Sequence, residues 1–169
     1  YKSGASSSVL PLSSITHASI GLDHGLAISE GKLYGWGSNG FGQLGTGSSA
    51  ISSVVLIDQS RTWVSCHAGG FHSFAIDSTG QVFAWGKNFS GQLGLGHKNP
   101  VASPTPLSLS FEGEDILLGH QHTLFLAKDG SVYSCGSNRF GQLARPSTET
   151  TDSTPTVVTL PTSIQLEAG

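Results

Sequence analysis

The chain has 169 residues, a formal net charge of −3 and only 11 % charged residues. It offers neither the clustered basic face of a nucleic-acid-binding protein nor a polybasic membrane patch. No apolar run approaches the roughly 20 residues of a membrane span. We therefore expect no direct nucleic-acid binding and no membrane insertion. The 23 glycines are about twice the usual share of roughly 7 % and indicate many turns.

A repeat of about 50 residues runs through the chain. Gly21, Gly69, Gly119 and Gly169 are 48, 50 and 50 residues apart. A period in the range of about 20–50 residues is typical of a solenoid, a propeller or an array. We place the repeats at approximately 21–68, 69–118 and 119–168, within a single propeller segment over 1–169. Residues 1–20 are interpreted as the end of a preceding blade.

Each repeat is predicted to form four short antiparallel strands. In the second repeat, apolar and β-branched runs cover 63–68, 72–76 and 81–85, and a weaker run at 107–111 follows Pro104 and Pro106. Runs of this length, bounded by glycine, proline and serine, read as strands. Proline cannot donate to a strand ladder, so these prolines belong at strand starts or on edge strands. No helical apolar spacing is present.

The fold class predicted from these runs is all-β, a β-propeller segment of about three four-stranded antiparallel blades. A β-sandwich of short strands is the competing all-β architecture. Propellers close with about 4–8 blades, so we expect missing sequence or another chain to complete the ring. A fragment, a partial chain and a propeller split between chains all remain open.

The repeats share a set of residues at equivalent positions. A glycine is followed three residues later by histidine, then by an aromatic-Gly-x-Asn turn and by Gly-Gln-Leu. The set comprises Gly21, His24, Trp36, Gly37, Asn39, Gly42, Gln43 and Leu44 in the first copy, Gly69, His72, Trp85, Gly86, Asn88, Gly91, Gln92 and Leu93 in the second, and Gly119, His122, Gly136, Asn138, Gly141, Gln142 and Leu143 in the third. We interpret these residues as structural.

Two of these positions allow specific expectations. The histidines are expected to be half-buried, each using its ring N–H to satisfy a backbone carbonyl of a neighbouring blade. The tryptophans Trp36 and Trp85, with Cys135 at the third position, are expected to pack between sheets. The alternatives are a metal ligand for the histidines and an aromatic cage for the tryptophans, and we favour the structural roles.

No catalytic constellation stands out in the sequence. Residues 40–45 spell G-x-G-x-x-G, but a dinucleotide site needs a helix after that motif, and none is predicted. His120 and His122 lack a third metal ligand at suitable spacing. We therefore expect no catalytic residues, no cofactor and no metal. Two isolated cysteines, Cys66 and Cys135, favour free thiols in a reducing compartment.

The string from His24 to Gly47 closely resembles a repeat of the regulator of chromosome condensation family. It recurs from His72 to Gly96, and in degraded form from His122 to Leu143, where Cys135 replaces tryptophan. The resemblance implies a seven-bladed propeller whose blades are built partly from neighbouring repeats, with three blades here. Members of this family include exchange factors for a small nuclear GTPase, domains of large ubiquitin ligases, ciliary and mitochondrial proteins, and a plant photoreceptor.

The leading functional hypothesis is a non-catalytic protein-binding or scaffold module. Binding residues concentrate on loops held by a rigid frame, and the loops at 46–53, 97–104 and 145–154 differ between repeats. The candidate partner-facing residues are Lys87, Phe89, His97, Lys98, Arg139, Phe140 and Arg145. The alternatives are an exchange factor for a Ras-like GTPase and a regulatory domain of a larger ubiquitin ligase or kinase. We expect an intracellular location, cytoplasmic or nuclear, with mitochondrial and ciliary locations left open.

Overall fold

The computed structural model of the chain describes residues 12–47, 51–146 and 148–159. These residues form strands joined by turns, and no helix occurs in these three ranges. The strands are β1 (Ile15–Ile20), β2 (His24–Ser29), β3 (Lys32–Gly37), β4 (Ile51–Asp58), β5 (Trp63–Ala68), β6 (His72–Asp77), β7 (Val82–Gly86), β8 (Val101–Pro106), β9 (Gly113–Leu118), β10 (His122–Ala127), β11 (Val132–Ser137) and β12 (Thr151–Val157).

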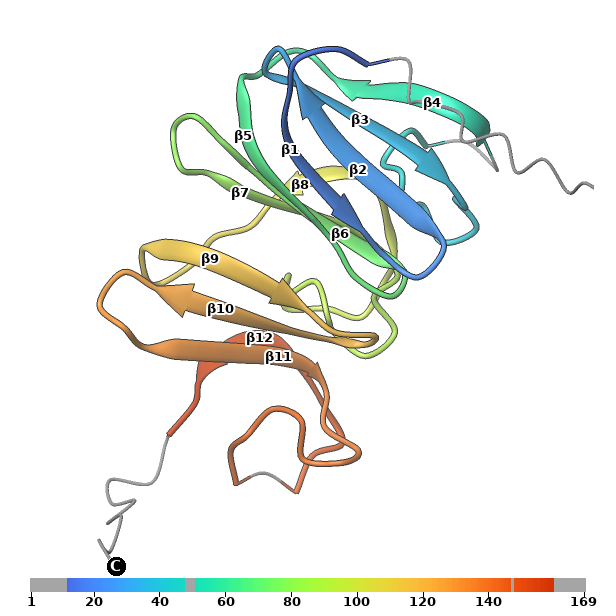
Figure 1. Cartoon of the computed structure of the whole chain (residues 1–169). Helices are drawn as coiled ribbons and strands as arrows, with labels where there is room; N and C mark the ends of the chain where they lie inside the picture. Colours follow the sequence, from blue (N-terminus) through green and yellow to red (C-terminus); the bar gives the residue numbers. More distant parts are fainter. Residues whose placement is uncertain (1–11, 48–50, 147, 160–169) are drawn as a thin grey trace, which may run out of the picture.

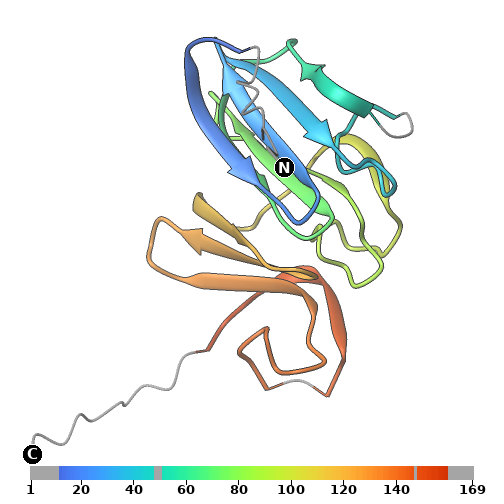
Figure 2. The same cartoon turned by 45° about the vertical axis from the view of Figure 1, so that its right-hand side comes forward.

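The strands form three four-stranded antiparallel sheets, β1 to β4, β5 to β8 and β9 to β12, each paired in chain order. We call them the first, second and third blades. Figure 1 shows the blades fanned one after another along the chain, and Figure 2 shows the same succession from a second side. The prediction of an all-β propeller segment with three four-stranded antiparallel blades is confirmed.

The sequence repeats and the blades are offset by one strand. Strand β1 pairs with β2 in the first blade, so the assignment of residues 15–20 to a preceding blade is wrong. Likewise, β5 lies at the end of the first repeat but pairs with β6 in the second blade. Each repeat therefore begins at the turn between the first and second strands of a blade, and its last strand starts the next blade. Residues 1–11 and 160–169 lie outside the described residues.

The fourth strand of the second blade also differs from its predicted position. It covers Val101–Pro106 rather than 107–111, and it pairs with β7 at the edge of the sheet. Pro104 and Pro106 therefore lie within an edge strand, where a missing N–H donor on the outward side is tolerated. The predicted position was too late in the chain because residues 107–111, which follow the prolines, are more apolar than the residues that form β8.

The hydrophobic core lies between consecutive blades. Leu26 and Ile28 of the first blade pack in one cluster with Trp63 and Phe83 of the second. A second cluster joins the second and third blades and includes Phe74, Leu93, Ile116 and Phe125. Because successive strand residues point to opposite faces, a central strand such as β6 supplies Ala75 to one cluster and Phe74 to the other. The blades thus depend on each other for burial.

Candidate binding face

The strand directions give the molecule two faces with different loops. The turns after β1, β5 and β9 lie at the same strand ends as the connections β3–β4, β7–β8 and β11–β12, because β2 begins where β3 ends. We call this end the signature face. The turns β2–β3, β6–β7 and β10–β11, with the connections β4–β5 and β8–β9, form the opposite end, which we call the hairpin face.

The repeated asparagine and glutamine brace the loops of the signature face. Oδ1 of Asn39 accepts a hydrogen bond from the N–H of Leu44 at 2.9 Å, and Oε1 of Gln43 accepts one from the N–H of Phe41 at 2.8 Å. The same two bonds recur in the second blade through Asn88 and Gln92 and in the third through Asn138 and Gln142. These loops are therefore held rigidly, as a binding surface requires.

Two of the three repeated histidines, His24 and His72, reach the next blade through a hydroxyl group. Nε2 of His24 lies 2.8 Å from Oγ of Ser73, and that hydroxyl donates to the carbonyl of Gln43 at 2.8 Å. Nε2 of His72 and Oγ1 of Thr123 lie 3.2 Å apart in the equivalent arrangement. Since the hydroxyl proton is used on the carbonyl, the hydroxyl accepts the histidine N–H. The expected direct bond to a carbonyl is thus replaced by a relay through serine or threonine.

Burial of these histidines predicts acid sensitivity. Desolvation lowers the pKa of His72 from 6.5 to about 3. It also lowers the pKa of His24 to about 4, because it outweighs the opposite effect of the Asp23 carboxylate, which raises that pKa. The folded state keeps both rings neutral while the unfolded chain binds protons below about pH 6.5, so the stability they contribute is complete above that pH and is lost as pH falls. We expect a loss of about 2 kcal/mol per buried histidine near pH 5.

Urea unfolding of the full-length protein near pH 7.5 and pH 5 measures this loss. His72→Gln removes one titrating ring while keeping a side-chain donor, so its unfolding free energy should fall less with pH than that of the wild type. An equal fall in both proteins would show that His72 does not titrate on unfolding as we describe.

A cluster of aromatic side chains surrounds Lys87 on the signature face. We call Lys87, Phe41, Phe71, Phe89 and His120 the Lys87 cluster. Nζ of Lys87 lies 4.7 Å from the ring centroid of Phe41 and 5.0 Å from that of Phe71. The Phe41 centroid is 5.3 Å from that of Phe71 and 6.2 Å from that of Phe89, and the Phe71 centroid is 5.6 Å from His120. Three blades therefore supply one surface.

Four other predicted partner-facing residues lie on the same face and are exposed. Phe140 is 92 % exposed and Arg139 is exposed beside it. His97 and Lys98 are exposed on the β7–β8 connection, and Nζ of Lys98 lies 2.6 Å from Oγ1 of Thr151 in the next blade. These four positions, with Phe89 at 57 % exposure, are available to a partner.

Arg145 is engaged within its own blade. Its Nη2 lies 2.7 Å from Oδ2 of Asp152, and its side chain is only 11 % exposed. The same nitrogen also donates to the carbonyl of Ser134. Arg145 thus braces the β11–β12 connection, and we leave it out of the candidate binding surface.

Sequence reasoning missed three members of the Lys87 cluster. Phe41, Phe71 and His120 come from a loop of the first blade and from turns of the second and third blades. Phe71 occupies the position held by Asp23 and Gln121 in the other repeats, and this divergence within a repeated frame was the available signal. Their proximity depends on how the blades stack.

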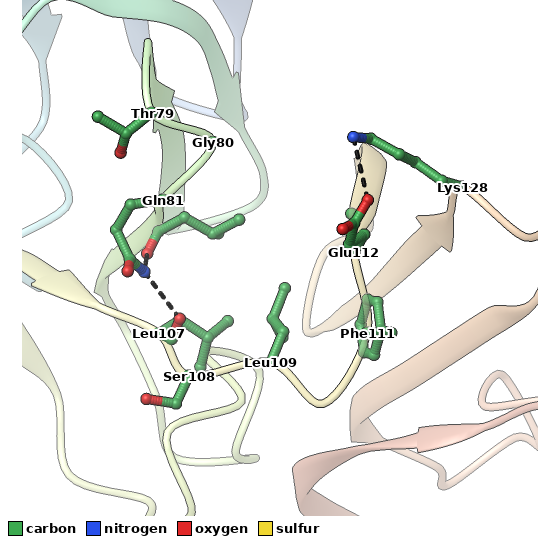
Figure 3. Close-up of a pocket in the computed structure, with 11 residues that line it drawn as sticks. Thr79, Gly80, Gln81, Leu107, Ser108, Leu109, Phe111, Glu112 and Lys128 are labelled. Carbon is green, nitrogen blue, oxygen red and sulfur yellow. Dashed lines mark hydrogen bonds and ion pairs between the residues drawn. The ribbon is translucent and has the colours of Figure 1, made fainter.

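The hairpin face has a hollow of its own between the second and third blades, about 450 Å³ in volume. Figure 3 shows Gln81 on one side and the Glu112–Lys128 ion pair on the other, with Leu109 between them and Phe111 beside Glu112. Nε2 of Gln81 donates to the carbonyls of Val82 and Leu107, each at 2.9 Å. These polar groups are satisfied within the chain, so the Lys87 cluster is the stronger candidate.

The described residues hold no group of three or more histidine, cysteine or acidic side chains placed to bind a metal ion. Over the same residues, we found no helix with the length and apolar character needed to cross a membrane. Residues 40–45, which spell the glycine-rich motif, form turns. In these turns the N–H of Gly42 donates a hydrogen bond to the carbonyl of Asn39, and the N–H of Gly45 donates one to the carbonyl of Gly42. Both cysteines are free and buried, and desolvation raises the pKa of the Cys66 thiol to about 12.

Comparison with known proteins identifies the family. A model of the Regulator of chromosome condensation (RCC1) repeat matches residues 30–76 and 79–126, and a second model of that repeat matches 64–92 and 116–142. The chain therefore belongs to the RCC1 repeat family.

Curated relatives come from different functional classes. The human "Probable E3 ubiquitin-protein ligase HERC6" is 39 % identical over 139 residues, which is 76 % of this chain and 14 % of that protein. The "Secretion-regulating guanine nucleotide exchange factor" of Bos taurus is 36 % identical over 120 residues, 68 % of this chain and 26 % of that protein. The chain thus spans about a quarter or less of the length of these relatives.

Solved structures agree on the fold. A structure of Kap60 bound to yeast RCC1 (Prp20) aligns with a TM-score of 0.79 at 21 % identity, covering 89 % of this chain and 38 % of that one. Human WBSCR16 aligns with a TM-score of 0.74 at 24 % identity, covering 86 % of this chain and 39 % of that one.

Proposed function

We propose that this chain belongs to a propeller that binds a partner protein on its signature face. The observation that carries the proposal is the Lys87 cluster, in which the exposed rings of Phe89 and His120 and a cation without an ion pair share a surface held by rigid turns. Aromatic side chains are enriched in protein interfaces, and they dominate binding energy where they lie near the interface centre. In this proposal the propeller acts as a scaffold, and the loops select the partner.

Affinity capture with the full-length protein tests this proposal, with partners identified by mass spectrometry. Phe89→Ser combined with Phe140→Ser should weaken the captured complex by about 1–2 kcal/mol per side chain, because both rings are exposed on the signature face. Val157→Ser is the matched control, since Val157 is 46 % exposed on the edge strand β12. Equal affinity of the double variant and the control for the partner would argue against the signature face.

An exchange factor for a small GTPase is a second candidate. It is favoured by the match to the bovine exchange factor, and by the fold shared with Prp20p of Saccharomyces cerevisiae, described together with its binding properties to Gsp1p and histones. Such an enzyme stabilises the nucleotide-free GTPase, so it needs no acid–base pair. Capture with and without EDTA, which strips magnesium and nucleotide from GTPases, separates the two functions. A GTPase enriched only with EDTA, followed by accelerated nucleotide release, would support exchange.

A regulatory domain within a larger ubiquitin ligase is the third candidate, favoured by the match to HERC6. The sequence of the full-length protein decides it, because a catalytic ligase domain would be recognisable there. Under all three proposals the protein works inside the cell, in the cytoplasm or nucleus, and fluorescence imaging of a tagged full-length protein tests that location.

A further inference from the structure

The middle blade breaks the hydrogen-bond pattern that its neighbours share. In the first blade, Nε2 of Gln43 donates to Oγ of Ser38 at 3.3 Å and to Oδ1 of Asp23 at 3.4 Å. In the third blade, Nε2 of Gln142 donates to Oγ of Ser137 at 3.3 Å. The position equivalent to these serines is Lys87 in the second blade.

The lysine leaves a buried amide without an acceptor. The side-chain oxygen of Gln92 accepts the N–H of Ser90, as in the other blades, so its amide group has the same orientation. Its Nε2 is buried and has no hydrogen-bond partner among the described residues, and Gln92 as a whole is 0 % exposed. Phe71, which stands where Asp23 stands in the first blade, supplies no acceptor either. An unsatisfied buried donor destabilises a fold.

The side chain of Lys87 therefore does not take the place of the serine hydroxyl as a hydrogen-bond acceptor for Gln92. Its ammonium group forms no ion pair within the described parts of the chain, and it is held between the rings of Phe41 and Phe71. Departures from a local rule that cost stability are expected at functional sites. The arrangement holds a positive charge at a fixed place among apolar rings.

We propose that Lys87 anchors an acidic segment of the partner protein, with a carboxylate on its ammonium group and a neighbouring apolar side chain against Phe89. Charge complementarity selects this occupant. The cation lacks a counter-ion, and Lys98 and Arg139 add positive charge on the same face. Phe89, 57 % exposed, offers the apolar contact. This inference rests on the proposed protein-binding function and specifies the chemistry of the partner.

Peptide binding to the full-length protein tests the inference. The probe is a fluorescein-labelled Gly-Ser-Glu-Asp-Leu-Phe-Glu-Asp-Gly-Ser peptide, and the comparison peptide replaces each acid by its amide. We expect the acidic peptide to bind at least about tenfold more tightly, because a hydrogen bond to a charged group contributes about that factor. Lys87→Ser should remove this preference. Equal binding of the two peptides to the wild type would overturn the proposal.

Lys98→Ser is the matched control, since it removes one positive charge from the same face and leaves the Lys87 cluster intact. It should keep most of the preference for the acidic peptide. An equal loss in the two variants would mean that diffuse charge attracts the peptide, which also overturns the proposal. Dimerisation of the protein that depends on Lys87, seen by light scattering, would do the same by assigning the site to a second copy.

Thermal unfolding of the variants guards against a trivial loss of binding. Lys87→Ser recreates the serine–glutamine bond of the other blades, so we expect its melting temperature to rise by roughly 2–4 °C. A lower melting temperature than the wild type would contradict the argument from Gln92. A partner that is captured by the signature face while both peptides bind equally would leave the proposed function standing and remove only the acidic-segment inference.

Discussion

Replacing Trp85 by alanine is expected to lower the free energy of unfolding by about 3–5 kcal/mol. Trp85 is 0 % exposed and packs in the cluster that joins the first and second blades. Its Nε1 donates to the carbonyl of Gln43 in the first blade at 2.8 Å. The substitution therefore opens a cavity at a blade interface and removes a bond between the blades. Urea unfolding of the full-length protein measures the loss.

Trp85→Phe separates the two contributions. It keeps most of the buried ring but removes the indole N–H, while Ser73 still donates to the same carbonyl. Because that carbonyl remains satisfied, we expect a loss of only about 1–2 kcal/mol. Equal losses for the alanine and phenylalanine variants would show that the hydrogen bond, rather than packing, carries the stability at this interface.

Replacing Gly69 by alanine is expected to destabilise the fold by about 2–4 kcal/mol. A Cβ atom at this position would lie 2.5 Å from Cε1 and 2.9 Å from Nδ1 of His72, and 3.0 Å from the carbonyl oxygen of Gly119. His72 is fully buried and bonded to Thr123, so it cannot yield without breaking the relay to the third blade. Chemical denaturation compares the variant with wild type.

Gly40→Ala is the matched control for this prediction. A Cβ atom at Gly40 would meet nothing within 4 Å, and its backbone is outside the left-handed region. We expect a change within about 0.5 kcal/mol, with a small gain from the stiffer unfolded chain. A Gly69→Ala variant as stable as Gly40→Ala would contradict the view that the repeated glycine exists to accommodate the histidine ring.

The Gly-x-x-His spacing shows how local sequence can reveal a non-local joint. The glycine at 69 makes room for the ring at 72, and that ring then bonds to Thr123 about one period further along the chain. The period was visible because both interfaces between the described blades use the same joint. The serine or threonine that accepts the hydrogen bond from the histidine was not expected, since Ser73 and Thr123 have the sequence pattern of ordinary strand residues.

Strand positions were predictable to different degrees within one blade. The runs at 63–68, 72–76 and 81–85 agree closely with β5, β6 and β7. Strands β6 and β7 are central, and β5, although at the edge of its sheet, packs against β1 and β2 of the first blade, so all three need apolar residues. The edge strand β8 was placed too late in the chain. An edge strand carries fewer packing requirements and can include proline, so its sequence signal is weak.

The sequence by itself determined the propeller class, the blade period and the braced turns, because strand alternation, turn chemistry and interblade joints recur every 50 residues or so and reinforce each other. Only the tertiary structure decided where the Lys87 cluster lies, since its members come from three blades and meet only when these stack. It also decided that Arg145 is held by Asp152 while Lys87 is unpaired. Whether a charge is paired depends on neighbours that are distant along the chain, and no repeat pattern records them.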